Sequence, residues 1–294
     1  MNASLRIWVE AARPKTLVAA FVPVMVGTAL AASAGLGDYA KAGICLAFAL
    51  LVQVGTNFAN DYFDFVQGAD TAARTGPRRA VAAGLISPGR MLAVTNAVLG
   101  VAFLVGLLLV REGGWVLLAV GVVSIVCAIA YTGGPFPLGY NGLGDLFVFV
   151  FFGLVAVGAT CFVQTHRLAP DALVAGAGIG LLAANILVAN NYRDAETDAR
   201  AGKRTLVVRF GRRFAVWQYA LSHTLALACP VLLLVTGHHW PVLFPLVLAP
   251  LAARLTRRLS RSRDPAEQVA LLGATAGYLA AYGVLLSAGL LFAR

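Results

Sequence analysis

Charged residues are scarce in this chain. Aspartate, glutamate, lysine and arginine make up 12% of its 294 residues, whereas a water-soluble globular protein has about 25%. Hydrophobic residues make up 60%, and the mean hydropathy is +0.81. A single buried core cannot take up so much apolar surface, so a lipid bilayer has to cover most of the exterior. The composition excludes a cytosolic enzyme, a disordered chain and a fibrous repeat.

Cysteine and histidine are also rare. The four cysteines lie far apart in apolar stretches with no Cys-x-x-Cys spacing, and the four histidines are scattered along the chain. Neither pattern matches a zinc site or a disulfide framework. We therefore interpret Cys45, Cys127, Cys161 and Cys229 as small core residues.

Long uncharged runs define the predicted architecture. A helix crosses about 30 Å of hydrocarbon with roughly 20 residues, and most of the runs reach that length. We predict an all-α, polytopic membrane protein with about nine transmembrane helices in one bundle. The eighth run is the shortest, and its three prolines favour a kink or a shallow insertion. The runs are 16–37, 42–60, 91–110, 113–144, 146–165, 172–192, 214–237, 237–253 and 268–293.

Basic residues alternate along the chain in a way that predicts its orientation. With the N-terminus inside and nine crossings, 19 of the 23 lysines and arginines fall in inside segments, as expected for the cytoplasmic face. The net charge of +10 therefore reflects topology, and we predict no nucleic-acid partner. Residues 1–15 lack the apolar core of a cleaved signal peptide and predict a short interfacial helix. The arginines within 254–261 share one helical face that suits anionic lipid headgroups.

Acidic residues are few and clustered. Six of the 13 fall in two windows, residues 57–70 at the inner end of the second predicted helix and residues 190–204 at the inner end of the sixth. Polar residues in each window are three or four positions apart, so they share one face of a helix. These residues are Asn57, Asn60 and Asp64 in the first window and Asn190, Asp194 and Asp198 in the second.

The two windows also suggest an internal repeat. Each window ends an apolar span with Asn-x-x-x-Asp and precedes an arginine-rich segment on the inside of the membrane. The two windows are about 130 residues apart in the sequence. We interpret the chain as two divergent repeats of about four helices that share one site. The result is a single transmembrane domain, residues 1–294. Its parts are an interfacial helix 1–15, a first half 16–132, a Gly/Pro-rich loop 133–144, a second half 145–255 and a last helix 267–293.

Stacked carboxylates favour a metal site over simple ion pairs or helix caps. An aspartate at the centre of a membrane helix costs roughly 2.5–3.5 kcal/mol, and a divalent cation removes that cost. The donors are hard oxygens, which indicates Mg²⁺ completed by phosphate oxygens and hence a diphosphate ligand. Basic side chains beside both windows suit phosphate, although the positive-inside bias alone could place them. They are Arg74, Arg78, Arg79, Arg193, Lys203 and Arg204.

These two windows resemble the aspartate-rich motifs of the UbiA superfamily of intramembrane aromatic prenyltransferases, and the predicted helix number is similar too. Within that superfamily, further segments resemble the 1,4-dihydroxy-2-naphthoate polyprenyltransferases of menaquinone biosynthesis. The resemblance covers about residues 10–215. The segments that carry it are 13–16, 68–70, 76–79, 84–86, 131–145 and 190–206.

The chain departs from the wider superfamily at two positions. A third acid commonly follows the first asparagine by eight residues, but Gly68 stands there and Asp70 comes two residues later. On a continuous helix Asp70 would face elsewhere, so a metal role requires the helix to unwind at Gly68. Many relatives also have a lysine four residues after the tyrosine of the central loop, where this chain has Pro135. Both departures agree with the naphthoate subfamily.

The resemblance implies a Mg²⁺-dependent enzyme of a bacterial cytoplasmic membrane, with its active site on the cytoplasmic side. It implies transfer of a polyprenyl group from polyprenyl diphosphate to 1,4-dihydroxy-2-naphthoate, with loss of CO₂ and diphosphate, to give demethylmenaquinone. Asn60, Asp64, Asp194 and Asp198 would bind the metal, and these three aspartates with Lys203 would be catalytic. The substrate-binding residues would be Lys15, Asn57, Arg79, Tyr131, Tyr140, Asn190, Arg193 and Arg204.

Two other functions fit parts of the sequence. The same chemistry could prenylate 4-hydroxybenzoate or homogentisate, and 4-hydroxybenzoate presents a ring carbon that bears hydrogen and so requires a base to remove the proton. A secondary transporter would share the repeats and the intramembrane acids. Transport predicts carboxylates near the bilayer midplane, whereas these acids lie at the inner ends of the helices. The sequence makes no prediction of oligomeric state.

Overall fold

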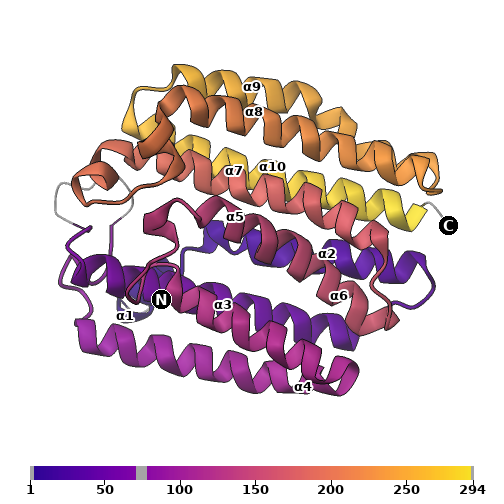
Figure 1. Cartoon of the computed structure of the whole chain (residues 1–294), viewed down its shortest axis with the longest axis horizontal. Coiled ribbons are helices and arrows are strands. Elements are labelled where there is room, and N and C mark those ends of the chain that lie inside the picture. The colour runs from indigo at the N-terminus through magenta and orange to yellow at the C-terminus, as the bar shows by residue number, and fades with distance from the viewer. Residues whose placement is uncertain (1–2, 71–77, 293–294) are drawn as a thin grey trace.

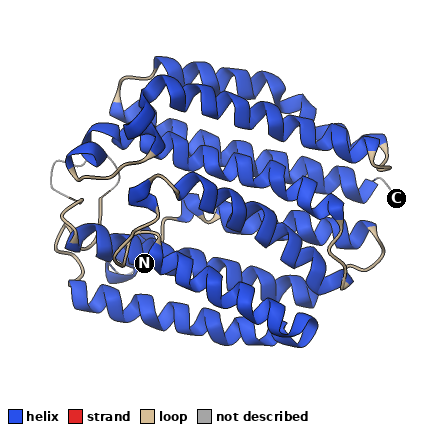
Figure 2. Ribbon diagram, viewed as in Figure 1, coloured by secondary structure: helices blue, strands red, loops and turns tan. Residues whose placement is uncertain are grey.

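The computed structural model describes residues 3–70 and 78–292, and every regular element within those ranges is a helix (Figure 2). The all-α prediction is confirmed. Arg74 and residues 76–77 of the predicted motif lie outside the described residues. The elements are α1 Ala3–Ala11, η1 Pro14–Thr16, α2 Val18–Ser33, α3 Tyr39–Val66, α4 Pro88–Ala130, η2 Gly139–Asn141, α5 Gly144–Val148, η3 Phe149–Val155, α6 Ala156–Thr165, α7 Pro170–Arg200, α8 Leu206–Val235, η4 Trp240–Leu248, α9 Ala249–Arg261 and α10 Pro265–Phe292 (Figure 1).

The 43 residues of α4 form a helical hairpin. Gly114 has φ 57° and ψ −145°, a conformation that glycine adopts without a steric penalty. The ring of Phe48 on α3 lies within 4 Å of the Cβ positions of both Gly106 and Gly121. Those positions would be about 22 Å apart on one straight helix, so the chain reverses at Gly114. The two arms of α4 correspond to the third and fourth predicted helices.

The number of membrane crossings is only partly fixed by the structure. Among the described residues, six helices are long and apolar enough to cross a bilayer when α4 is counted once, and a seventh is added if residues 4–16 and α2 form one bent span. Each predicted run coincides with helical structure, but α2 and the η4–α9 segment are short or partly polar. The count of nine crossings and the internal repeat therefore stay predictions.

The eighth predicted helix is longer than expected. Its first nine residues form the 3₁₀-helix η4, which contains Pro241 and Pro245. Proline lacks the backbone N–H that α-helical bonding needs, so the regular α-helix starts only at Ala249. It then continues to Arg261, beyond the predicted end at residue 253, and the basic residues of this region lie on a helix.

Glycines allow α7 to approach the α5–η3–α6 span closely. A Cβ at Gly153 would lie 2.5 Å from the carbonyl oxygen of Gly176, and a Cβ at Gly180 would lie 2.5 Å from that of Phe149. Residues Phe149–Val155 form a π-helix, which often marks a functional region of a helix. Because α7 carries the second acidic window, this packing positions that window against the rest of the bundle.

The N-terminal segment is fastened to α3 by a side-chain amide. Asn57 donates from Nδ2 to the carbonyl oxygen of Ala12 at 2.8 Å and to Thr16 Oγ1 at 3.1 Å. Between these two partners, Arg13 has φ 52° and ψ 70°, in the left-handed region that non-glycine residues rarely occupy. The turn between α1 and α2 is thereby held against the first acidic window.

Candidate active site

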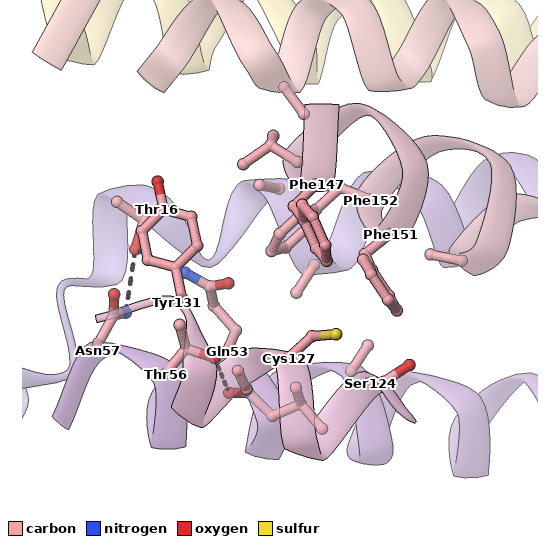
Figure 3. Close-up of a pocket in the computed structure, with 18 of the residues that line it drawn as sticks. Thr16, Gln53, Thr56, Asn57, Ser124, Cys127, Tyr131, Phe147, Phe151 and Phe152 are labelled. Atoms are coloured by element: carbon pink, nitrogen blue, oxygen red, sulfur yellow. Dashed lines mark hydrogen bonds between the residues drawn. The ribbon is translucent and has the colours of Figure 1, made fainter. Parts of the chain in front are cut away.

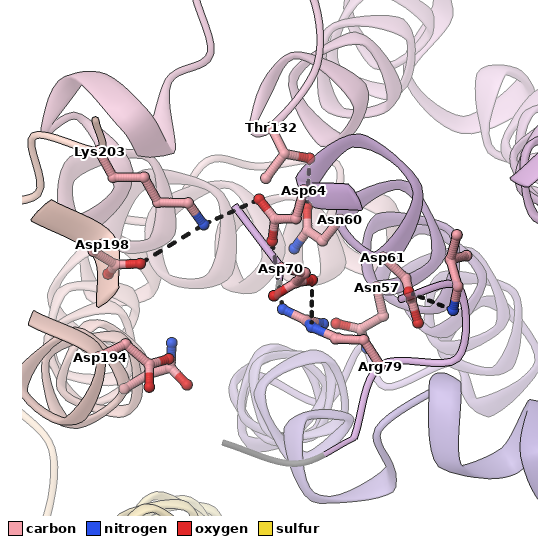
Figure 4. Close-up of polar contacts among 12 residues, drawn as sticks. Asn57, Asn60, Asp61, Asp64, Asp70, Arg79, Thr132, Asp194, Asp198 and Lys203 are labelled. Atoms are coloured by element: carbon pink, nitrogen blue, oxygen red, sulfur yellow. Dashed lines mark hydrogen bonds and ion pairs between the residues drawn. The ribbon is translucent and has the colours of Figure 1, made fainter. Parts of the chain in front are cut away.

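The two acidic windows meet at one end of the bundle, which we call the acidic end. Lys203 connects them: its Nζ lies 3.0 Å from Asp64 Oδ1 and 3.8 Å from Asp198 Oδ1 (Figure 4). All three side chains are largely buried: the exposed fraction is 14% for Lys203, 3% for Asp64 and 13% for Asp198. A buried positive charge is thus shared by carboxylates from α3 and α7. The predicted convergence of Asp64 and Asp198 is observed in the geometry.

Asp194, the third predicted carboxylate, has a different partner. Arg193 donates to both of its oxygens, at 2.7 Å from Nε and 2.6 Å from an Nη, and a further bond from Arg193 reaches Asn190 Oδ1 at 2.8 Å. Such a bidentate contact is among the stronger hydrogen-bonded pairs. Asp194 and Asn190 line the cavity described below, whereas Arg193 lies behind them. Arg193 therefore orients Asp194 and is not itself placed to contact a ligand in the cavity.

Asp70 returns to the acidic end because α3 stops before it. Helix α3 ends at Val66, Gly68 has φ 70°, and the amides of Ala69 and Asp70 both donate to the carbonyl oxygen of Asp64. The unwinding at Gly68 that the sequence required is therefore present. Asp70 then pairs with Arg79 at 3.1 Å, and the same guanidinium reaches Asp64 at 3.5 Å.

Asp61 belongs to the first window but has a structural role. Its two carboxylate oxygens accept hydrogen bonds from the backbone amides of Ala80 and Val81, at 3.0 and 3.1 Å. It is 2% exposed. These bonds hold the loop that carries Arg79 against α3, so Asp61 helps to position Arg79.

Tyr140 reaches the acidic end from the central loop. Its hydroxyl donates to Asp64 Oδ1 at 2.8 Å, and its ring centroid lies 4.6 Å from Lys203 Nζ. Burial and the neighbouring Asp64 carboxylate raise the pKa of Tyr140 well above its ordinary value, because both disfavour the phenolate. The phenol therefore stays a hydrogen-bond donor to Asp64 throughout the physiological range.

A cavity of about 340 Å³ extends from the acidic end into the bundle. One face of α3 lines it from Asp64 to Cys45, a distance of about 28 Å along the helix. That face is polar near Asp64 and becomes apolar beyond Gln53. The cavity therefore combines a charged end with a long apolar arm. The lining residues of α3 are Cys45, Phe48, Ala49, Val52, Gln53, Thr56, Asn57, Asn60 and Asp64.

Aromatic side chains stand where the polar and apolar parts of the cavity meet. Figure 3 shows Tyr131 on the side of Gln53, with Phe147, Phe151 and Phe152 across the cavity from it. Phe147 and Phe151 stack with ring centroids 5.8 Å apart. A Cβ at Gly139 or Gly144 would come within about 3 Å of the Tyr131 ring or hydroxyl, so the glycine-rich loop makes room for that ring.

The remaining predicted residues fall into two groups. Asn60 lines the cavity and accepts a hydrogen bond from Thr132 at 2.9 Å, and Asn57 lines it while its amide is bound to the N-terminal turn. Lys15 and Arg204 are exposed and are not among the residues that line the cavity. The sequence placed them near the diphosphate because they adjoin recognised motifs, but the 3₁₀-turn at Lys15 and the turn after Gly202 direct them outward.

Sequence reasoning missed several residues that line the cavity, and Arg13 and Gln53 are the two with the most direct chemical interest. Arg13 lines it and donates to the carbonyl oxygen of Asn57 at 3.4 Å. Gln53 is 7% exposed, donates to Thr16 Oγ1 at 3.3 Å, and has a buried Oε1 with no hydrogen-bond partner. Gln53 is four residues before Asn57 on the same face of α3, which is the signal that could have identified it.

The residues at the acidic end fit a hard divalent cation. Asp64 and Asp198 supply carboxylate oxygens and already share a positively charged group, the ammonium of Lys203. Asn60 adds an amide oxygen of the kind that Mg²⁺ accepts. Among the described side chains, no three of the histidine, cysteine, aspartate and glutamate types gather into a metal site, so a bound cation would need ligands beyond these carboxylates.

Comparison with known proteins gives consistent matches along the chain. The model of the UbiA prenyltransferase family matches residues 20–276. The 1,4-dihydroxy-2-naphthoate octaprenyltransferase of Haemophilus influenzae is 37% identical, over 99% of this chain and 97% of that protein. The protein of the same description from Mycobacterium tuberculosis is 39% identical over 99% of both chains. The structure of a UbiA homolog from Archaeoglobus fulgidus bound to GPP and Mg²⁺ has the same fold, with TM-score 0.67 and 16% identity over 96% of this chain and 99% of that chain.

Proposed function

The chain belongs to the UbiA prenyltransferase family, and from that premise we propose that it transfers a polyprenyl group from a polyprenyl diphosphate to 1,4-dihydroxy-2-naphthoate. Diphosphate and CO₂ leave, and the product is demethylmenaquinone in its hydroquinone form. One observation carries the proposal: Asp64 and Asp198, from windows far apart in sequence, share Lys203 at the mouth of an apolar cavity. The enzyme is an integral membrane protein.

The charged end of the cavity is suited to a diphosphate. Lys203 and Arg79 lie beside Asp64 and can donate to phosphate oxygens as negative charge develops on the leaving group. Asn60, Asp64, Asp194 and Asp198 would hold Mg²⁺, which supplies Lewis-acid stabilisation of that charge when bound. The Archaeoglobus fulgidus homolog was solved with a prenyl diphosphate and Mg²⁺, which supports this assignment.

The apolar arm is suited to the hydrocarbon tail of the donor. Beyond Gln53, the α3 face of the cavity carries Val52, Ala49, Phe48 and Cys45, none of which competes for hydrogen bonds with a lipid. Cleavage of the bond between the allylic carbon and the diphosphate oxygen leaves an allylic cation. Tyr131 and Phe147 line the cavity where the polar and apolar parts meet, and aromatic faces stabilise such a cation by about 0.5–2 kcal/mol each.

The acceptor would occupy the space between Gln53 and the aromatic side chains. The unpartnered Gln53 Oε1 can accept a hydrogen bond from a ring hydroxyl, and Arg13 offers a positive charge to the carboxylate. The ring carbon that bears the carboxylate forms the new bond to the allylic carbon. The bond to the carboxyl carbon then breaks, its electron pair restores the aromatic ring, and CO₂ departs.

The distribution of basic residues supports a cytoplasmic active site. The acidic end carries the arginine-rich segments near residues 78–90 and 193–213, which the positive-inside rule assigns to the cytoplasm. We therefore place the N-terminus and the active site on the cytoplasmic side of a bacterial inner membrane. A cysteine introduced at exposed Gly202 should react with a membrane-impermeant maleimide in inverted vesicles but not in intact spheroplasts.

Reconstituted protein provides the test of function. Given farnesyl diphosphate, Mg²⁺ and 1,4-dihydroxy-2-naphthoate labelled in the carboxyl group, it should release labelled CO₂ and one diphosphate per prenylated product. EDTA should stop the reaction, and added Mg²⁺ should restore it. A product that keeps the labelled carboxyl group, or faster turnover with 4-hydroxybenzoate or homogentisate, would reject the proposed acceptor. Turnover that persists without divalent metal would reject the proposed chemistry.

A further inference from the structure

Helix α9 has one strongly basic face. Arg254, Arg257 and Arg261 are exposed and, at spacings of three and four residues, lie along one side of the helix. Ala252, Leu255 and Leu259 are buried on the opposite side, where α9 packs against α8 and α10. The basic face therefore points away from the bundle. We call Arg254, Arg257 and Arg261 the α9 arginine face.

Helix α9 itself contains no acidic residue. The acids that follow it are Asp264 and Glu267, and Glu267 pairs at 3.9 Å with Arg258, which lies beside the face. The exposed arginines Arg209 and Arg212 on α8 differ, because each donates hydrogen bonds to protein oxygens. An external anion is the natural partner of three such guanidinium groups.

The depth of the arginine face suggests what that anion is. Figure 1 shows the C-terminal end of α9 at the same end of the bundle as the connection between α7 and α8, which carries Lys203. The three arginines span about 10 Å along the helix. The headgroup layer on one side of a bilayer is about 5–8 Å thick, and arginine side chains extend toward it from deeper positions.

We propose that the α9 arginine face binds anionic phospholipid headgroups at the membrane surface nearest the active site. One guanidinium group can donate two parallel hydrogen bonds to two oxygens of a phosphate. Each basic residue at a membrane surface strengthens binding to anionic lipid by about fivefold. A second copy of the chain is a poor occupant, because two identical arginine faces would repel each other. The site lies outside the catalytic cavity, so the inference does not depend on the identity of the substrate.

Lipid-dependent thermal stability of the full-length chain in neutral detergent tests the proposal. Phosphatidylglycerol should raise the midpoint of unfolding of the wild-type protein more than phosphatidylcholine does. In R254Q/R257Q/R261Q the difference in unfolding midpoint between the two lipids should fall to less than half of the wild-type difference. In the wild type, 0.5 M NaCl should also reduce this difference. The control R6Q/R111Q/R167Q removes the same number of charges from exposed arginines elsewhere. It should keep the full wild-type difference in unfolding midpoint between the two lipids.

A second measurement separates binding from folding. Phospholipid that co-purifies with each variant is extracted and counted, and the triple α9 variant should retain several-fold less phosphatidylglycerol than the wild type and the control. Equal retention in all three proteins would overturn the proposal. So would stabilisation by inorganic phosphate equal to that by phosphatidylglycerol, or a change in oligomeric state of the triple variant, because the face would then bind free phosphate or another copy.

Discussion

Lys203 places its ammonium nitrogen 3.0 Å from Oδ1 of Asp64, although the two residues are 139 positions apart in sequence. The contact joins α3 to the segment that follows α7, and Asp198 on α7 shares the positive charge of Lys203. Removing Lys203 would leave two mostly buried carboxylates without this shared positive charge, which is a destabilising change. The arrangement gives the proposed diphosphate a site where cationic and anionic side chains from both windows already lie together.

Lys203→Ala should reduce kcat by about 100-fold or more, because it removes a preorganised positive charge beside the departing diphosphate. Steady-state kinetics with varied donor concentration should also show a raised KM for the donor. Lys15→Ala is the matched control, since Lys15 is exposed and does not line the cavity; its kinetics should stay within about twofold of wild type. A similar loss in both variants would contradict the assignment.

Gln53→Ala should weaken acceptor binding selectively. The lost hydrogen bond to a ring hydroxyl is worth about 0.5–1.5 kcal/mol, which corresponds to a rise of roughly 2- to 13-fold in the KM for the acceptor. The KM for the donor serves as the internal control and should change little. If the donor KM rises and the acceptor KM does not, Gln53 contacts the prenyl diphosphate and the placement of the acceptor is wrong.

Tyr140→Phe should lower kcat/KM by a factor that does not vary between pH 7 and pH 9.5. The reason is the raised pKa of Tyr140: the hydroxyl remains protonated above the ordinary value of about 10 and keeps donating to Asp64. Parallel pH profiles of the two proteins check this. Convergence of the profiles as the pH rises toward 9.5 would mean that the wild-type phenol ionises in that range.

Gly153→Ala should destabilise the bundle by about 1–3 kcal/mol, because the new methyl group would lie 2.5 Å from the carbonyl oxygen of Gly176 on α7. Thermal unfolding in detergent measures the effect. Gly43→Ala is the control, since no atom lies within 4 Å of a Cβ at that helical position, and alanine favours a helix over glycine. Equal stability of both variants would show that η3 and α7 can separate at little cost.

Much of this architecture could be predicted from the sequence because it depends on local patterns. Uncharged runs marked the long helices of the bundle, and the four-residue spacing of Asn60 and Asp64 placed them on one face. Gly114 breaks α4 into a hairpin, which the charges at 111 and 112 had already indicated. The acidic clusters likewise predicted that α3 and α7 carry the site.

Features that depend on tertiary contacts were not predictable. Asp194 is held by its neighbour Arg193, and only the packed structure shows that Arg193 lies behind the cavity while Arg13 lines it. The return of Asp70 to Arg79 required the turn at Gly68. Gln53 became a candidate because its oxygen is buried without a partner. Such pairings depend on which side chains from distant segments fill the same space.

A double-mutant cycle between Asp64 and Asp198 tests the central claim, that the two windows act on one diphosphate. Mg²⁺-dependent prenyl transfer to 1,4-dihydroxy-2-naphthoate is measured for wild type, Asp64→Asn, Asp198→Asn and the double variant. Each single change should lower kcat/KM by about 100-fold or more, and the double variant should be little worse than either, because residues that act as a unit are not additive. Losses that multiply in the double variant, or full activity in either single variant, would show that the windows act separately.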